Sequence, residues 1–219
     1  MNNVINVLVA DDDHHLCSAL RQLIDHEDDM RTVGVAHDGD EAVELALGMQ
    51  PDVMLLDVQM PRLSGLEVLK MLLRQSNPPR IIMLTMFDLD EYVYEALRNG
   101  ATGFLLKNSA PRSIVDAIRS SLDGTSLLSS EVTNRLISHL APIRKDALIE
   151  HLTARELETL VYIGRGLSND EIARLLFVTP TTIRTYVSRI MSKLCVSHRA
   201  QLVVAAYENG LISPGDVSH

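Results

Sequence analysis

The sequence predicts an α/β doubly wound domain followed by an all-α domain of four helices. In the first half, short β-branched runs alternate with segments of helix length, and this alternation stops near residue 124. From Leu152 onward the pattern is helical only. Alternating strands and helices are typical of a parallel sheet with helices on both faces. A chain of 219 residues is long enough to form two domains.

The first half contains five apolar runs that we interpret as strands. They are almost continuously hydrophobic, as expected of parallel strands buried on both faces, and they span residues 4–10, 32–36, 52–57, 81–85 and 103–107. Helical segments lie between them, at residues 14–26, 39–49 and 64–75 among others. Five strands that alternate with helices predict a sheet of flavodoxin-like order, 2-1-3-4-5, with any ligand site at the carboxyl ends of the strands.

This pattern predicts that the chain is divided into two domains and a linker. We expect the first domain to span residues 1–123 and the second to span residues 150–219. Residues 124–149 would form a linker with one connecting helix, at about 129–140, before Pro142 and a stretch of mixed charge. The two domains differ in character, so each is expected to have its own partners.

The net charge of −9 is unevenly distributed. Residues 1–124 carry 20 acidic side chains against 10 basic ones, whereas residues 125–219 carry 9 against 10. Between Ile172 and Tyr207 there are five basic residues and no acidic one. A locally basic second half indicates an anionic partner such as nucleic acid.

The remaining composition excludes other classes of protein. Cys17 and Cys195 are far apart and lack metal-ligand spacing, so we expect small packed residues in a reducing cytosol rather than a disulfide framework. No apolar stretch approaches the roughly 18 residues of a membrane span. The N-terminus lacks the basic head of a signal peptide. The sequence therefore predicts a cytoplasmic protein without a membrane partner.

Polar residues follow four of the predicted strands. Asp11 and Asp12 follow the first, Asp57 ends the third, Thr85 ends the fourth and Lys107 ends the fifth. In the predicted order these strands are contiguous, so their ends converge on one edge. Carboxylates this close repel one another unless a cation lies among them. Carboxylates, a backbone carbonyl and waters suit Mg²⁺, and the set is suited to phosphoryl transfer through an aspartyl phosphate.

These residues resemble a response-regulator receiver domain over about residues 4–122. The matching segments are "VLVADD", "PDVMLLDVQMPRLSGLEVL", "IIMLT" and "GATGFLLKN". The resemblance implies that Asp57 is the phosphoacceptor and that Lys107 pairs with the phosphoryl group. It also implies an Mg²⁺ ion held by Asp57, by Asp11, more directly by Asp12, and by the backbone carbonyl of Gln59. Thr85 would move toward the phosphoryl group, and Phe104 matches the family's aromatic switch position.

A rival interpretation pairs Asp11 with Asp13 as the DxD motif of haloacid-dehalogenase-type phosphohydrolases. In that fold the nucleophile follows the first strand, which would leave "LLDVQMPRLSG" and the second half without a role. His14 and His15 could extend the acidic run into a second metal site. They enter a predicted helix, so we expect them to cap it or to face solvent.

The second half contains the signals of a helix-turn-helix. Ser168 and Glu171 form a capping box at the start of one helix, whose expected apolar residues are Ile172, Leu175 and Leu176. Thr179 is a predicted N-cap, followed by Pro180 at the first position of the next helix. That helix would bury a stripe of four residues at helical spacing, Ile183, Val187, Ile190 and Leu194.

The opposite face of this helix carries hydroxyls and bases without an acid: Thr181, Arg184, Thr185, Ser188, Arg189 and Lys193. A major groove and its phosphates call for such side chains. An ordinary solvated helix is the alternative, but it would normally mix charge signs. The segment from Leu152 to Leu194 resembles a LuxR-type helix-turn-helix, matched over roughly residues 150–212. In that family's terms, Arg184, Thr185 and Ser188 face base edges and the other three face the backbone.

Two residues depart from the family pattern. Tyr186 stands where a histidine is common, and Cys195 stands where a glycine often makes the turn. After this turn, "HRAQLVVAAYENG" predicts a last helix closed by Gly210. Its apolar residues are Leu202, Val203, Ala206 and Tyr207, and the resemblance implies that part of this surface pairs two copies on DNA.

A receiver followed by this helix-turn-helix is similar to NarL/FixJ-class two-component response regulators. The resemblance implies a transcription factor that a sensor histidine kinase phosphorylates at Asp57 and that binds double-stranded promoter DNA as a homodimer. Phosphorylation would draw Thr85 and Phe104 inward. No enzymatic activity is expected beyond slow self-dephosphorylation. The alternatives are a phosphoaspartate-forming phosphohydrolase and a DNA-binding regulator whose receiver is never phosphorylated.

Overall fold

The computed structural model describes residues 4–86, 90–122, 149 and 151–212, without the side chains of 90–94. Contacts divide the chain into two compact units, Met1–Asp123 and Gly124–His219. The connecting helix expected at 129–140 lies outside the described residues.

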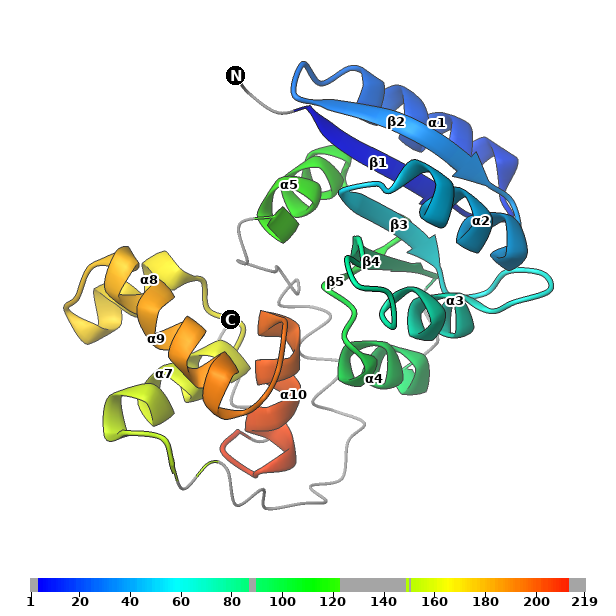
Figure 1. The fold of residues 1–219 in the computed structure, drawn as a ribbon. Coiled ribbons are helices and arrows are strands. Elements are labelled where there is room, and N and C mark those ends of the chain that lie inside the picture. Colours follow the sequence, from blue (N-terminus) through cyan, green and yellow to red (C-terminus); the bar gives the residue numbers. More distant parts are fainter. Residues whose placement is uncertain (1–3, 87–89, 123–148, 150, 213–219) are drawn as a thin grey trace. The chain divides into compact units, whose positions relative to one another are not determined.

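The first unit is built around five parallel strands (Figure 1). They are β1 (Ile5–Ala10), β2 (Met30–Ala36), β3 (Val53–Asp57), β4 (Arg80–Thr85) and β5 (Gly103–Leu106). Their order is β2-β1-β3-β4-β5, which confirms the predicted topology. Strand β3 is buried at every position, because it lies at the centre of a sheet covered on both faces.

Five helices cover the sheet in the described residues. They are α1 (His14–Asp25), α2 (Gly39–Met49), α3 (Gly65–Leu72), α4 (Asp90–Asn99) and α5 (Pro111–Leu122). Helices α1 and α5 pack on one face, where Leu20, Ile24 and Ile118 meet inward residues of the strands. Helices α2, α3 and α4 adjoin one another on the other face. This arrangement brings the carboxyl ends of the strands to one open edge.

The second unit contains four helices among its described residues, as predicted. They are α7 (Ala154–Gly164), α8 (Asn169–Leu176), α9 (Pro180–Lys193) and α10 (Arg199–Glu208). Ser168 and Glu171 form the expected capping box, and Thr179 caps α9 with Pro180 in its first turn. Ile172 and Leu176 are buried, but Leu175 is 50% exposed, so the prediction that it faces the core was wrong.

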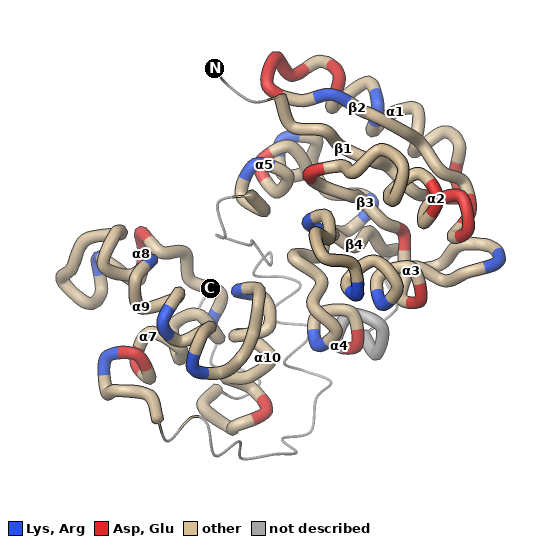
Figure 2. Tube along the Cα trace, in the orientation of Figure 1, with Lys and Arg blue, Asp and Glu red and all other residues tan. Residues whose placement is uncertain are grey.

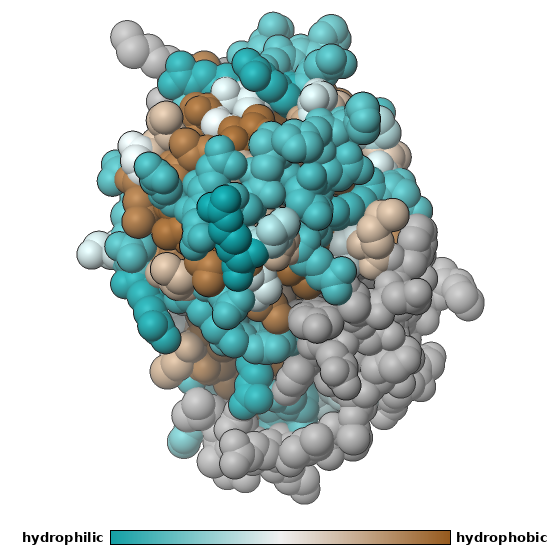
Figure 3. Space-filling model, turned by 90° about the vertical axis from the view of Figure 1, so that its right-hand side faces the viewer, coloured by the Kyte–Doolittle hydropathy of each residue, from teal (hydrophilic) through white to brown (hydrophobic). Residues whose placement is uncertain are grey.

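On the face in Figure 3, hydrophilic residues cover most of the described area, and hydrophobic residues occupy smaller areas between them. Among the helices of the described residues, none combines the length and the hydropathy that a membrane crossing requires.

Candidate functional site

Three carboxylates lie together at the carboxyl edge of the sheet. Asp11 follows β1 and is completely buried, Asp57 ends β3 and is 4% exposed, and Asp12 is exposed. One oxygen from each carboxylate can be chosen so that the three lie within 4.8 Å of one another. Parallel strands that neighbour each other in the sheet bring these side chains together, as their positions at strand ends predicted.

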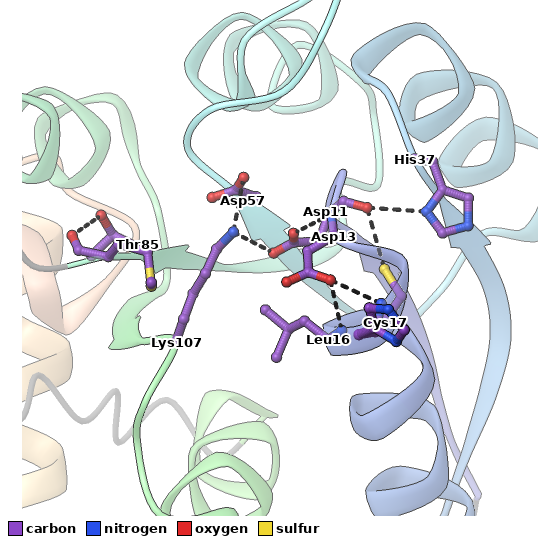
Figure 4. Close-up of polar contacts among 10 residues, drawn as sticks. Asp11, Asp13, Leu16, Cys17, His37, Asp57, Thr85 and Lys107 are labelled. Carbon is purple, nitrogen blue, oxygen red and sulfur yellow. Dashed lines mark hydrogen bonds and ion pairs between the residues drawn. The ribbon is translucent and has the colours of Figure 1, made fainter.

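Lys107, directly after β5, reaches into this group (Figure 4). Its Nζ lies 2.8 Å from Oδ2 of Asp11 and 3.1 Å from Oδ2 of Asp57. Burial acts to lower the pKa of Lys107, but its contacts with the two carboxylates outweigh burial and raise that pKa. Lys107 is therefore a charged partner of both aspartates.

One lysine does not balance the buried negative charge. Burial, and then the charge of Asp11, raise the pKa of Asp57 to about 6, although Lys107 and a backbone hydrogen bond from Gln59 act in the opposite direction. Removing a carboxylate from water and placing a second one beside it both disfavour the ionised form. The positive charge of Lys107 alone therefore does not balance the two buried carboxylates at neutral pH.

Carboxylates outnumber cations at this edge of the sheet. The buried Oδ2 of Asp11 contacts Lys107 alone among the described residues, and the same ammonium also serves Asp57. Buried carboxylates are costly unless enough positive charge lies among them. Hard divalent cations prefer oxygen ligands of this kind. Asp11, Asp12 and Asp57 therefore form a group that could hold a metal ion.

The backbone after Asp57 is held close by Gly65. The Gly65 N–H donates to the Val58 carbonyl at 2.9 Å, and a Cβ on Gly65 would lie 1.9 Å from the Asp57 carbonyl oxygen. Helix α3 starts at this glycine, with a capping box formed by Ser64 and Glu67. Only a residue without a side chain fits here. Sequence reasoning missed this contact, because nothing in the local pattern shows what Gly65 faces.

Thr85 and Phe104 take positions that the sequence did not specify. The Thr85 hydroxyl donates to the backbone carbonyl of Met86 at 2.8 Å, so in this structure it is bound to its neighbour and not to Asp57. Phe104 is already completely buried. The Phe104 ring is therefore already in an inward position in this structure.

Asp13, the last aspartate of the run that starts at Asp11, has a structural role. Asp13 caps α1 by accepting from the backbone N–H groups of His15 and Leu16, at 2.8 and 3.2 Å, and these bonds lower its pKa. His14 is exposed, and the centroid of its ring lies 3.8 Å from the centroid of the His37 ring. A capping carboxylate is a poor second member of a DxD motif, which weakens the phosphohydrolase interpretation.

Helix α9 presents the predicted polar face. Its buried stripe is confirmed, since Ile183 and Ile190 are completely buried, Val187 is 6% exposed and Leu194 is 9% exposed. Five of the six predicted DNA-facing residues are exposed: Thr181, Arg184, Thr185, Ser188 and Arg189. In Figure 2 this helix carries basic residues and no acidic one.

Two basic residues of the second unit bind groups of that same unit. Lys193 Nζ binds the Glu156 carboxylate at 2.6 Å and the His151 carbonyl at 3.1 Å. Arg199 is 7% exposed and donates to the Leu167 carbonyl and to Asn169, and burial lowers its pKa to about 10. Lys193, which the sequence predicted to face DNA, is therefore held by groups of its own unit. Glu156 escaped notice, although "TARE" is a visible capping box with Thr153.

The four residues predicted to pair two copies are buried, with exposures of 4% or less: Leu202, Val203, Ala206 and Tyr207. Ala206 lies against α7, since a Cβ on Gly164 would come within 2.8 Å of the Ala206 Cβ. Ala206 is thus a packing residue of its own domain. Pairing through α10 stays a prediction.

The cysteines differ. Cys17 is buried, as expected, and burial, followed by the charge of Asp11, raises its pKa to about 12. Cys195 is exposed, so the expectation of a packed side chain was wrong. It adopts a φ of 54°, the left-handed conformation that glycine favours at a turn.

A doubly wound sheet with this acidic edge, joined to a helix-turn-helix unit, defines a DNA-binding response regulator. Residues 7–119 match the response regulator receiver domain, and residues 150–206 match the luxR family of bacterial regulatory proteins. The chain belongs to the two-component response regulators of the NarL/FixJ class, with a receiver and a LuxR-type DNA-binding domain. The family is one of transcriptional regulators.

Individual relatives agree with this assignment. The chain is 39% identical to the uncharacterized transcriptional regulatory protein YxjL of Bacillus subtilis (strain 168), over 95% of this chain and 97% of that one. It is also 39% identical to the transcriptional regulatory protein LiaR of the same strain, over 96% and 100%. The crystal structure of response regulator ChrA from a heme-sensing two-component system matches with a TM-score of 0.54 and 32% identity, over 96% and 100% of the chains.

Proposed function

We propose that Asp57 accepts a phosphoryl group from a sensor histidine kinase, and that this modification controls binding to promoter DNA. The observation that carries the proposal is the position of Lys107, whose ammonium lies between two buried carboxylates, one of which ends a central strand. A carboxylate can act as a nucleophile toward phosphorus, and a nearby cation stabilises charge on the transferred oxygens.

Mg²⁺ is the cation that fits this pocket best. Asp11, Asp12 and Asp57 would hold it, together with the backbone carbonyl of Gln59, because a small hard cation prefers carboxylate and carbonyl oxygens. When bound, it would neutralise charge on the transferring phosphoryl group. Lys107 would then be free to pair with the phosphoryl oxygens.

Thr85 would transmit the change. Its hydroxyl would break its hydrogen bond to the Met86 carbonyl and would donate to a phosphoryl oxygen instead. Met86 is 63% exposed, so the exchange would alter the surface beside β4. Because Phe104 is already buried, Thr85 and not Phe104 would make the first movement.

The second unit would bind double-stranded DNA through the exposed face of α9, as a homodimer that matches paired half-sites. The exposed bases Arg184 and Arg189 suit phosphates and base edges, and Thr185 and Ser188 suit base edges. In the unphosphorylated protein we expect this helix to be partly occluded. Equal operator affinity before and after phosphorylation, at one salt concentration, would contradict that.

The proposal is tested by incubating the full chain with acetyl phosphate and Mg²⁺. Wild type is expected to gain one phosphoryl group by mass, Asp57→Asn none, and the exposed control Asp116→Asn one. DNA binding and dimerisation are followed in the same samples. Labelling of Asp57→Asn to wild-type extent would exclude Asp57 as the acceptor.

The same samples separate the alternatives. Multiple-turnover hydrolysis of an external phosphoester would favour a phosphohydrolase. Full DNA affinity in Asp57→Asn would favour a regulator that does not depend on phosphorylation. Slow loss of the label from Asp57 is expected, and this self-dephosphorylation is the full extent of the proposed catalysis.

A further inference from the structure

The end of the recognition helix α9 is tied to the start of α7 by a buried carboxylate. Glu156 is 3% exposed, and a single oxygen, Oε2, accepts three hydrogen bonds. The donors are the Thr153 N–H at 2.8 Å, the Thr153 hydroxyl at 2.9 Å and Lys193 Nζ at 2.6 Å. Lys193 also donates to the His151 carbonyl at 3.1 Å.

Both charges suit their helix ends. Glu156 is in the first turn of α7, where backbone N–H groups favour a negative charge, and Lys193 is the last residue of α9, where carbonyls favour a positive one. Bonds to Lys193 and Thr153 outweigh burial and lower the pKa of Glu156. Glu156 is therefore ionised at neutral pH, and its short hydrogen bond from Lys193 fixes one end of α9.

The exposed bases of α9 lack such a tether. Arg189 is one turn before Lys193 on the same helix, and it forms no ion pair with any carboxylate in the described part of the chain. The buried stripe from Ile183 to Ile190 resists rotation of the helix about its axis. Glu156 adds a polar fixed point at the end of α9 remote from Thr179, next to Leu194, the last buried residue of the stripe.

We propose that Lys193 and Glu156 position the recognition helix for base readout, and that Lys193 is a positioning residue instead of a phosphate contact. A lysine that moved away to a phosphate would leave the Glu156 carboxylate buried without a cation. A lysine that stays in place fixes the angle at which Arg184, Thr185 and Ser188 meet the groove. This inference rests on the proposed function only for its DNA measurements.

The test compares Glu156→Gln, Lys193→Met and the matched control Arg189→Met in the full chain. Glutamine preserves the capping box with Thr153 but removes the ion pair. Each variant is titrated, over a range of salt concentrations, with a duplex selected by wild type from a random pool and with a shuffled duplex. Thermal unfolding shows that each is folded at the assay temperature.

For both members of the pair we expect affinity for the selected duplex to fall about tenfold or more, as displaced positioning groups do. Affinity for the shuffled duplex and the salt dependence of binding should not change. Arg189→Met should instead weaken both duplexes and reduce the slope of log K against log salt by about 0.9. A loss of stability alone would leave the ratio of the two affinities unchanged.

Two results would overturn the proposal. If Lys193 contacts phosphate, Glu156→Gln frees it and DNA is bound more tightly, the opposite sign to the expected one. Lys193→Met would then flatten the salt slope as Arg189→Met does. If Glu156→Gln does not fold, Lys193→Met alone decides by its slope and its ratio of affinities.

A measurement without DNA tests the contact between Lys193 and Glu156 even if the proposed function is wrong. Hydrogen exchange of the last α9 amides should accelerate in Glu156→Gln and Lys193→Met but not in Arg189→Met. Should wild type bind neither duplex after incubation with acetyl phosphate and Mg²⁺, DNA binding as proposed is wrong, while faster exchange in the two variants still supports the tether. Unchanged exchange in both variants would refute it.

Discussion

The Nζ of Lys107 lies 2.8 Å from Oδ2 of Asp11, a buried oxygen that contacts no other donor among the described residues. The same nitrogen lies 3.1 Å from Asp57, so one positive charge serves two buried carboxylates. Burial, and next the charge of Asp11, raise the pKa of Asp57, and this single lysine does not offset them. Phosphate chemistry at Asp57 and stability of the fold are therefore linked through the same few charges.

Removing Lys107 should strengthen Mg²⁺ binding. The ammonium and the metal ion compete for oxygens of Asp11 and Asp57, so Lys107→Met removes a competitor. We expect the affinity for Mg²⁺ to rise by about 1 kcal/mol or more, the scale of two unit charges 4 Å apart in water. Isothermal titration at pH 8 measures it. Lys70→Met, which breaks an ion pair with Glu95 on α4, is the control and should change nothing; weaker binding in Lys107→Met would contradict the prediction.

The raised pKa of Asp57 predicts how stability depends on pH without metal. Its pKa is about 6 in the folded protein and near 3.8 when unfolded. Between these values the folded state binds more protons, so stability falls as pH rises from about 4 through 6. Asp57→Asn removes this loss and should be more stable than wild type at pH 7 by about 1–3 kcal/mol.

Urea unfolding in EDTA from pH 4 to 8 checks this, with the difference between Asp57→Asn and wild type as the readout. The difference should grow with pH and level off above 6. Adding Mg²⁺ should stabilise wild type more than the variant, because a ligand stabilises the state that binds it. An Asp57→Asn variant less stable than wild type at pH 7 would show that the pocket already balances the Asp57 charge.

Gly65 is expected to tolerate no side chain. A Cβ would lie 1.9 Å from the Asp57 carbonyl oxygen, so Gly65→Ala should cost about 3 kcal/mol and slow labelling of Asp57 by acetyl phosphate. Gly48 in α2 is the matched control, because a Cβ there meets no atom within 4 Å. Gly48→Ala should gain about 0.5–1 kcal/mol from its higher helix propensity. Equal stabilities of the two variants would disprove the close approach.

Cys195 is expected to be strained by its left-handed backbone. Its φ of 54° is a conformation that costs most residues about 1–2 kcal/mol and glycine almost nothing. Cys195→Gly should therefore raise the midpoint of thermal unfolding, whereas Cys195→Ala, which keeps a Cβ, should leave it near the wild-type value. A gain in both variants would assign the effect to loss of the thiol instead.

The sequence alone determined the sheet order, the helix starts and the polar strand ends. Those features depend on patterns within a few residues: continuous apolar runs for β3, the Thr179–Pro180 start of α9, and Asp57 at the end of its strand. Such signals are local because backbone geometry and capping act over one turn or one strand. The order of the sheet followed from how these units connect.

Only the tertiary structure decided which partner each polar side chain chose. Lys193 and Glu156 are 37 residues apart in sequence, Arg199 reaches Leu167, and Thr85 takes the carbonyl of its neighbour. A lysine on a polar helix face carries the same local signature whether it meets phosphate or a carboxylate. The choice depends on which distant groups folding places within about 3 Å, and on how far burial raises the cost of leaving a charge unpaired.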